Sequence, residues 1–152
     1  IYVSTITEKS VQDTSKVRTV LECMAIDSAV FPLSEAKLQE LERIDREQHE
    51  LIVTHPEDNL RFAELDKEFH CAIAECCDNA SLIEFIQSIN NVMVRFNVLS
   101  GTLPQNRQDA LIEHENIIAF LKKGQREFAK VALSEHLKHV EERMLSESKK
   151  ER

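Results

Sequence analysis

The sequence predicts an all-α protein, and three observations support that fold class. Its 152 residues include only two glycines and three prolines, so few positions favour the tight turns of β-structure. Leu, Glu, Lys, Ala and Ile are abundant, which favours long helices joined by short connections. Apolar residues also recur at helical spacing through most of the chain. The length and the 42% hydrophobic content suit one domain with a single core.

Breaks in this periodicity predict six helices. The expected helices cover residues 13–31, 34–54, 56–78, 79–99 and 104–124, and a sixth begins near residue 125. Pro32 and Gly124 end two of them, because proline cannot continue a helix and glycine commonly follows its last turn. Ser34 and Asn79 have the side chains that cap a helix N-terminus.

Two of these helices have informative apolar patterns. The first is expected to bury one stripe, made of Val17, Val20, Leu21, Met24 and Ala25. Arg18 and Glu22 lie at its margin and have the spacing of a surface ion pair. The fourth helix is apolar around more than half of its circumference, so we expect it at the centre of the fold or at an interface. Residues 1–12 are expected to form a tail or linker, and residues 13–148 the helical domain.

Charge and composition exclude several functions. With 19 basic and 27 acidic residues the net charge is −8, so this segment is not expected to bind DNA through its phosphates. No apolar run approaches the roughly 18 to 20 residues of a membrane span, and the N-terminus does not resemble a signal peptide. We therefore expect a cytoplasmic protein with no membrane partner. The four cysteines have no CxxC spacing and are expected to be reduced, buried side chains.

The stretch from Glu64 to Cys77 carries the first candidate site residues, Asp66 and His70. Residues four apart on a helix differ by about 40° in direction and about 6 Å along the axis, so both side chains point toward one place. Asp66 also falls where the apolar stripe of this helix requires another apolar residue. Such a pair is more often a simple surface pair, but an inward carboxylate is costly unless it meets a cation, hydrogen-bond donors or a metal.

Two further histidines, His114 and His136, interrupt the apolar stripes of the fifth and sixth helices. The other histidines lie off such stripes and are expected to be exposed: His49, His55 and His139. A single inward histidine is usually a hydrogen-bonded core residue. Three of them together with Asp66, each near the middle of a helix, predict a mononuclear site of three imidazoles and one carboxylate. That set suits Zn, Ni, Mn or Fe(II).

A set of short motifs extends along nearly all of residues 13–145. The motifs are Val17-Arg18-x-x-Leu-Glu22, Asp66-x-x-Phe69-His70, Asn79-x-x-Leu82, Leu111-x-Glu113-His114, Gly124, Ala129 and His136-Leu137. Together they resemble the FCD family, the C-terminal effector-binding domain of FadR-type GntR transcription regulators. Gln125 departs from the acidic residue that usually follows the family's glycine.

The resemblance implies an antiparallel bundle of six or seven helices around a cavity. It also implies one divalent metal ion per chain, with Zn or Ni expected, held by the matching residues Asp66, His70, His114 and His136. A small organic acid would bind at this metal, with Arg18 as the first candidate to contact its carboxylate and Arg95 as the second. The family forms dimers and follows a winged helix-turn-helix domain, which this chain lacks. We therefore expect a homodimer that reaches DNA only through a missing N-terminal domain.

The predicted function is metal-dependent sensing of a small organic acid in a GntR-type regulator, without enzyme activity. The alternative is a mononuclear metalloenzyme acting on a small carboxylic acid, since a metal with open positions can activate water. Glu113 would be the nearest base, but it points about 100° away from the direction of His114. A di-iron bundle needs Glu-x-x-His pairs, and none of the six histidines has Glu three residues before it.

Overall fold

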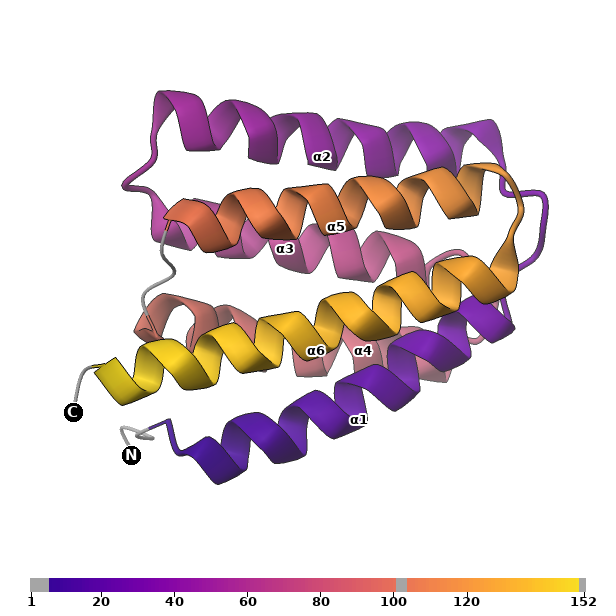
Figure 1. The fold of residues 1–152 in the computed structure, drawn as a ribbon. Coiled ribbons are helices and arrows are strands. Elements are labelled where there is room, and N and C mark those ends of the chain that lie inside the picture. Colours follow the sequence, from indigo (N-terminus) through magenta and orange to yellow (C-terminus); the bar gives the residue numbers. More distant parts are fainter. Residues whose placement is uncertain (1–5, 101–103, 151–152) are drawn as a thin grey trace.

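The computed structural model describes residues 6–100 and 104–150, and these residues form six helices (Figure 1). In chain order the helices are α1 (Glu8–Asp27), α2 (Glu35–Thr54), α3 (Asn59–Ala74), α4 (Ala80–Ser100), α5 (Pro104–Lys122) and α6 (Arg126–Lys150). Outside the helices, the described part of the chain contains one isolated antiparallel bridge, between Ala29 and Cys77. The all-α prediction is confirmed.

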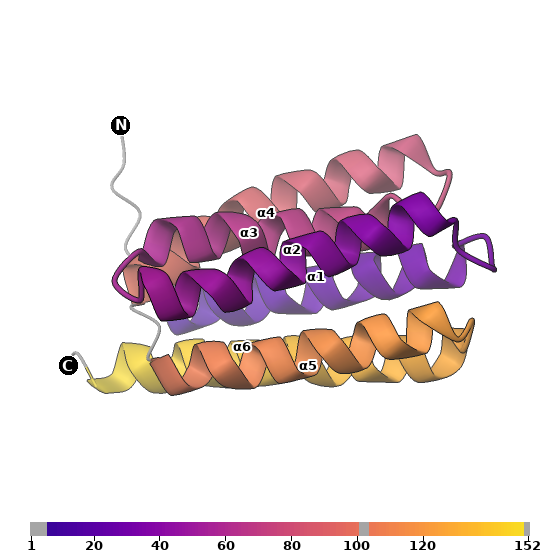
Figure 2. The same ribbon diagram turned by 90° about the horizontal axis from the view of Figure 1, so that it is seen from above.

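The helices run alternately up and down and close into a ring around the core (Figure 1). Around this ring α2 packs on α3, α3 on α4, α4 on α1, α1 on α6, α6 on α5, and α5 on α2. Further contacts, of α1 with α3 and of α4 with α6, cross the ring. Figure 2 shows α5 and α6 on one side of the bundle and α4 on the other. Side chains from all six helices can therefore meet at the centre.

The ends of the helices follow capping chemistry. Ser34 and Asp58 accept hydrogen bonds from backbone amides three residues later, and Asn79 does the same at the start of α4. Thr7 caps α1, which consequently begins at Glu8, earlier than the expected residue 13. Gly124 follows α5 with φ +70°, a conformation that favours glycine.

The face that α1 buries differs from the prediction. Val17, Val20 and Met24 were expected inside, but they are 52%, 62% and 45% exposed. Ala25 is buried as predicted, but the other buried residues of α1 are Val11, Ser15, Arg18, Glu22 and Ile26. The inward face of α1 therefore carries a charged pair into the centre of the bundle. An ion pair at the margin of an apolar stripe is also compatible with burial when each charge has a partner.

The fourth helix, α4, contributes to the core from one side. Leu82, Ile86, Met93 and Phe96 are buried, whereas Phe85 is 63% exposed. α4 is therefore not the central helix of this chain, and its place at an interface stays a prediction. The main apolar cluster instead joins side chains of α2, α3, α5 and α6 with Ile26 of α1 and with Ala29 and Leu33 of the following connection.

Two expectations from composition can be compared with the structure. Among the described residues, no helix is both long and apolar enough to cross a bilayer. All four cysteines are free thiols: Cys76 and Cys77 are buried, whereas Cys23 and Cys71 are partly buried. The cysteines thus act mainly as packing residues, as the absence of metal-type spacing suggested.

Candidate metal centre

Four of the predicted site residues meet in the middle of the bundle. Asp66 and His70 come from α3, His114 from α5 and His136 from α6. All four are buried, with exposed fractions of 7%, 0%, 0% and 1%. One ring nitrogen from each histidine lies within 4.8 Å of the others. Asp66 Oδ1 lies 3.2 Å from His114 Nε2, and Asp66 Oδ2 lies 3.8 Å from His70 Nε2.

The outer nitrogen of each histidine has its own hydrogen-bond acceptor. His70 Nδ1 donates to Glu22 Oε1 at 2.5 Å, and Glu22 belongs to α1. His114 Nδ1 donates to Gln48 Oε1 of α2 at 3.1 Å. His136 Nδ1 donates to Glu113 Oε1 of α5 at 2.7 Å. A carboxylate or amide oxygen at Nδ1 fixes the tautomer, so the hydrogen is on Nδ1 and each Nε2 presents a lone pair to the centre.

This arrangement leaves the centre short of positive charge. His114 Nε2 and His136 Nε2 are 3.2 Å apart, and neither carries a hydrogen in the tautomers fixed by their outer partners. His70 Nε2 is buried and has no hydrogen-bond partner. Lone pairs at such distances, beside the Asp66 carboxylate, repel one another unless a cation lies between them. The three imidazoles and the carboxylate thus fit a divalent metal ion.

The ring planes are held by packing. Phe69 stacks on His114 with ring centroids 3.9 Å apart, and His70 stacks on His136 at 5.3 Å. The rings of His114 and His136 meet edge to face at an interplanar angle of 77°. The histidines therefore have little freedom to turn away from the centre, and their Nε2 atoms are preorganised for a ligand.

The carboxylates nearest the centre are held ionised. Burial by itself would raise the pKa of Glu22, but His70 and Arg18 outweigh it and hold this pKa at about 2. Burial would likewise raise the pKa of Asp66, but its buried neighbours His114, His70 and Arg18 hold it well below its usual range. Both carboxylates are therefore negatively charged at neutral pH.

The imidazoles of His70 and His136 are held neutral. Burial lowers the pKa of His70 and lowers that of His136 to about 3. Glu113, which accepts the hydrogen bond of His136, has its pKa held at about 2 by His136 and Arg143 against the opposing effect of burial. Neutral imidazoles beside ionised carboxylates are the protonation states that bind a metal ion.

Arg18 lies on the α1 side of the centre, in a buried pair rather than the expected surface pair. Its Nε donates to Glu22 Oε2 at 2.7 Å, and the two side chains are 2% and 0% exposed. Arg18 Nη2 is buried and has no hydrogen-bond partner. Asn90 of α4 approaches the same Glu22 oxygen at 3.4 Å. Arg18 thus offers a donor inside the bundle, where the charge of a bound acid would be matched.

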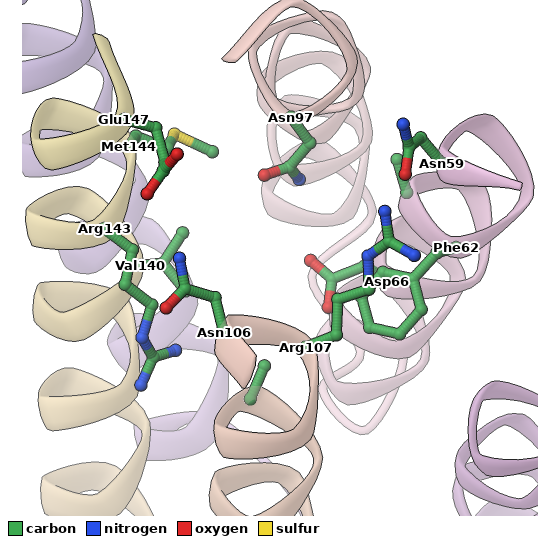
Figure 3. Close-up of a pocket in the computed structure, with 12 residues that line it drawn as sticks. Asn59, Phe62, Asp66, Asn97, Asn106, Arg107, Val140, Arg143, Met144 and Glu147 are labelled. Carbon is green, nitrogen blue, oxygen red and sulfur yellow. The ribbon is translucent and has the colours of Figure 1, made fainter. Parts of the chain in front are cut away.

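A pocket adjoins the centre through Asp66 (Figure 3). It lies between α3, α4, α5 and α6, and its volume of about 40 Å³ gives room for two or three water molecules or a group of that size. Its polar lining includes Asn59, Asn97, Asn106, Arg107, Arg143 and Asp66. Arg107 is buried, and its Nε has no hydrogen-bond partner. The pocket therefore combines one unpaired donor, Arg107 Nε, with one wall of the candidate centre.

The last predicted site residue, Arg95, and the three histidines expected to be exposed are not brought to the centre. Arg95 lies on an exposed face of α4 and does not line this pocket. The side chains of His55 and His139 are 67% and 46% exposed, as expected. His49 is only partly exposed, because its Nε2 pairs with Glu115 Oε1 at 2.7 Å.

Several residues of the site were missed from the sequence. They are Glu22, Gln48, Asn90, Arg107, Glu113 and Arg143. Gln48 and Asn90 gave a usable signal, since each is a polar residue in an apolar stripe, after Ile44 and Ile86 respectively. Glu113 was noted only as a possible base beside His114, and its place beside the apolar stripe does not indicate that it reaches His136.

Comparison with known proteins places this architecture. Residues 13–139 match the FCD domain family. The chain is 27% identical over 145 residues to the "Uncharacterized HTH-type transcriptional regulator YdhC" of Bacillus subtilis (strain 168). That alignment covers 91% of this chain and 64% of the relative, so the chain spans just under two thirds of the relative's length.

Two solved structures share the fold at low sequence identity. A transcriptional regulator, GntR, from Rhodococcus sp. RHA1 aligns with a TM-score of 0.80 and 19% identity over 95% of this chain and 68% of that chain. A structure described as the metal-free FCD domain of TM0439 aligns with a TM-score of 0.74 and 20% identity over 97% and 99% of the two chains. At such identities the likeness concerns the fold alone.

These findings agree with the motifs. The family match spans most of the chain, and the helical architecture is that of the FCD structure. The relatives are described as transcriptional regulators, which agrees with the expectation of a regulatory domain. The chain belongs to the FCD domain family, the helical domain of GntR-type transcription regulators.

Proposed function

We propose that this domain senses a small organic acid with the help of one divalent metal ion per chain. The observation that carries the proposal is the convergence of three Nε2 atoms and the Asp66 carboxylate on one point, with every outer Nδ1 already paired. A core histidine needs a partner for each nitrogen, whereas these three histidines have their inner nitrogens directed at one another.

The donor set narrows the choice of metal. Three neutral imidazoles and one carboxylate are borderline ligands, which favour Zn or Ni over Ca and Mg. Four protein ligands leave positions free for an acid if the metal is six-coordinate. Asp66 faces both the histidines and the pocket, so an acid in the pocket would lie beside the centre.

The acid is assigned from the donors that have no partner. Arg18 Nη2 lies on one side of the centre and Arg107 Nε on the pocket side, and both are buried without hydrogen bonds. Buried guanidinium groups of this kind suit carboxylates, because charge-assisted hydrogen bonds compensate for their desolvation. The volume of about 40 Å³ favours a small acid or the carboxylate end of a longer one.

Regulation would follow from coupling between the acid and the arrangement of helices. An acid that binds one arrangement better than another shifts the population toward it, and a dimer can transmit that shift to DNA-binding domains. We propose that a DNA-binding domain precedes this chain in the whole protein. We also propose that the whole protein acts as a homodimer in the cytoplasm. The metalloenzyme alternative has less support, because Glu113, the base candidate beside His114 in the sequence, accepts a hydrogen bond from His136.

Metal content tests the proposal. Elemental analysis of the purified chain should give about one divalent metal ion per chain, or uptake of one Zn or Ni ion after chelation and dialysis. Acetate and other small carboxylic acids should then raise the melting temperature of the metal-loaded protein and be recovered chemically unchanged. Absence of metal together with no uptake would refute the metal site, and turnover of the acid would favour an enzyme.

A further inference from the structure

The carboxylate of Glu113 joins a buried centre residue to side chains near the surface. Glu113 Oε1 accepts from His136 Nδ1 at 2.7 Å and from Arg143 Nη1 at 3.0 Å. Glu113 Oε2 accepts from His139 Nδ1 at 2.8 Å and from Arg143 Nη2. The His136 side chain is fully buried, whereas those of Glu113 and Arg143 are 18% and 19% exposed. Glu113 thus divides its charge between the centre and a solvent-accessible arginine.

Arg143 also lines the pocket that holds Asp66. Figure 3 shows its side chain leaving α6 beside Val140, with the guanidinium turned away from Asp66. Arg107 lines the same pocket, but its Nη1 donates to the carbonyl oxygen of Pro56. The two arginines therefore differ in one respect that matters: Arg143 contacts the carboxylate that holds a centre histidine, and Arg107 contacts a backbone carbonyl.

We propose that Arg143 couples the pocket to the histidine centre: a carboxylate in the pocket draws Arg143 away from Glu113, and the released Glu113 holds His136 more strongly. This inference rests on the proposed function, because it requires that the pocket accept a small acid. The movement is a rotation of one partly exposed side chain, and the new ion pair compensates for the lost one.

The sign of the coupling follows from the charge on Glu113. While Arg143 is paired with it, the carboxylate is a weaker acceptor for the Nδ1 hydrogen of His136. Once Arg143 leaves, the bond from His136 strengthens, and Nε2 of that ring becomes more basic. Acid binding and metal binding should therefore reinforce each other, and by linkage each must change the affinity of the other by the same factor.

Zinc titration against a competing chelator dye, with and without saturating acetate, tests the coupling. In the parent chain, acetate should tighten zinc binding about fivefold or more. In Arg143→Gln the zinc affinity without acetate should equal or exceed that of the parent, and acetate should no longer change it. Retained coupling in Arg143→Gln would overturn the inference. Zinc binding in Arg143→Gln that is about tenfold weaker than in the parent would also overturn it. Arg143 would then support the centre rather than weaken Glu113 as an acceptor for His136.

Arg107→Gln is the matched control, because it removes an arginine of the same pocket without touching Glu113. This variant should need more acetate, yet reach the full coupling at saturation. Nitrogen-15 NMR of the metal-free proteins gives a readout without zinc: the His136 Nδ1 hydrogen should remain hydrogen-bonded to Glu113 in Arg143→Gln.

A parent chain whose zinc affinity does not change with acetate would contradict the proposed acid site and the coupling together. Weakened zinc binding in Arg143→Gln alone would overturn only the coupling.

Discussion

Asp66 and His70 on α3 have the same spacing as Asp45 and His49 on α2, but the surroundings of the two pairs differ. The side chains of the α3 pair are 10% and 0% exposed, and those of the α2 pair 15% and 43%. His70 Nε2 is buried without a partner, whereas His49 Nε2 has an ion pair with Glu115 at 2.7 Å. The same sequence motif thus contributes to a candidate metal centre in one helix and to a surface cluster in another.

The difference comes from α5, which contacts α2 and lies beside the centre. Its consecutive residues His114 and Glu115 point about 100° apart, so α5 presents an imidazole inward and a carboxylate outward. The inner pair on α3 meets His114 and also receives His136 from α6. The pair on α2, Asp45 and His49, instead lies close to the carboxylate of Glu115. The spacing of Asp and His along a helix identifies candidate metal ligands, and the residues that face them from neighbouring helices determine whether a metal centre can form.

Removing the metal should produce the largest contrast between the two pairs. With free metal at a thousandfold excess over its Kd, binding stabilises the fold by about 4 kcal/mol, or roughly 8 to 16 °C in melting temperature for a chain of this size. A chelator should therefore lower the melting temperature of the parent and of Asp45→Ala by this amount. Asp66→Ala should show almost no chelator effect, and an equal response of both variants would contradict the assignment.

Loss of one imidazole from each pair sharpens the comparison. His70→Ala should weaken zinc binding by more than about a hundredfold, because loss of a direct ligand costs more than the roughly 10- to 100-fold of an outer partner. His49→Ala should leave zinc affinity unchanged at this centre. Competition with a chelator dye measures both affinities, and circular dichroism checks that each variant is folded. Equal losses in both variants would show that the inner and outer pairs had been assigned wrongly.

Much of the fold was predictable because helix breaks have clear chemistry. Ser34 and Asn79 cap the helices that they were expected to precede, and Gly124 follows α5 as expected. The inward positions of the centre histidines were also predictable, since each interrupts an apolar stripe. That they meet at one site was also predicted, from their number and from the resemblance to the FCD family, and His70, His114 and His136 do meet. The hydrogen-bond partners of their outer nitrogens were not predicted, because these depend on how the helices face one another.

The sequence was misleading where charged residues are buried. On α1 the apolar residues Val17, Val20 and Met24 form a plausible inner stripe, yet the buried residues include Arg18 and Glu22. A charged pair is expected at the surface unless a third group compensates it, and here that group is a histidine from another helix. Residue type and spacing within α1 contain no information about that partner.

Neighbouring residues on α2 allow a finer test of the same comparison. Gln48 accepts the hydrogen bond of His114 Nδ1, whereas His49 faces the surface cluster. Gln48→Ala should weaken zinc binding by roughly 10- to 100-fold, because an outer partner fixes the tautomer and direction of its ligand. Gln48→Glu, which retains an acceptor, should recover part of this loss. No difference between the Ala and Glu variants would mean that Gln48 acts through packing alone.

The smallest expected effect concerns the ion pair between His49 of α2 and Glu115 of α5. The His49 and Glu115 side chains are 43% and 52% exposed, so solvent screens their 2.7 Å ion pair. Exposed pairs contribute about 0.2 to 1 kcal/mol, which is a change of roughly 4 °C or less in melting temperature for a chain of this size. A double-mutant cycle with His49→Gln and Glu115→Gln, measured by urea unfolding of the metal-free protein, isolates the coupling free energy of the pair. High salt should reduce that value further. A coupling free energy above about 2 kcal/mol that does not change with salt would show that His49 and Glu115 are as well shielded from solvent as Asp66 and His70. The contrast between α2 and α3 would then fail.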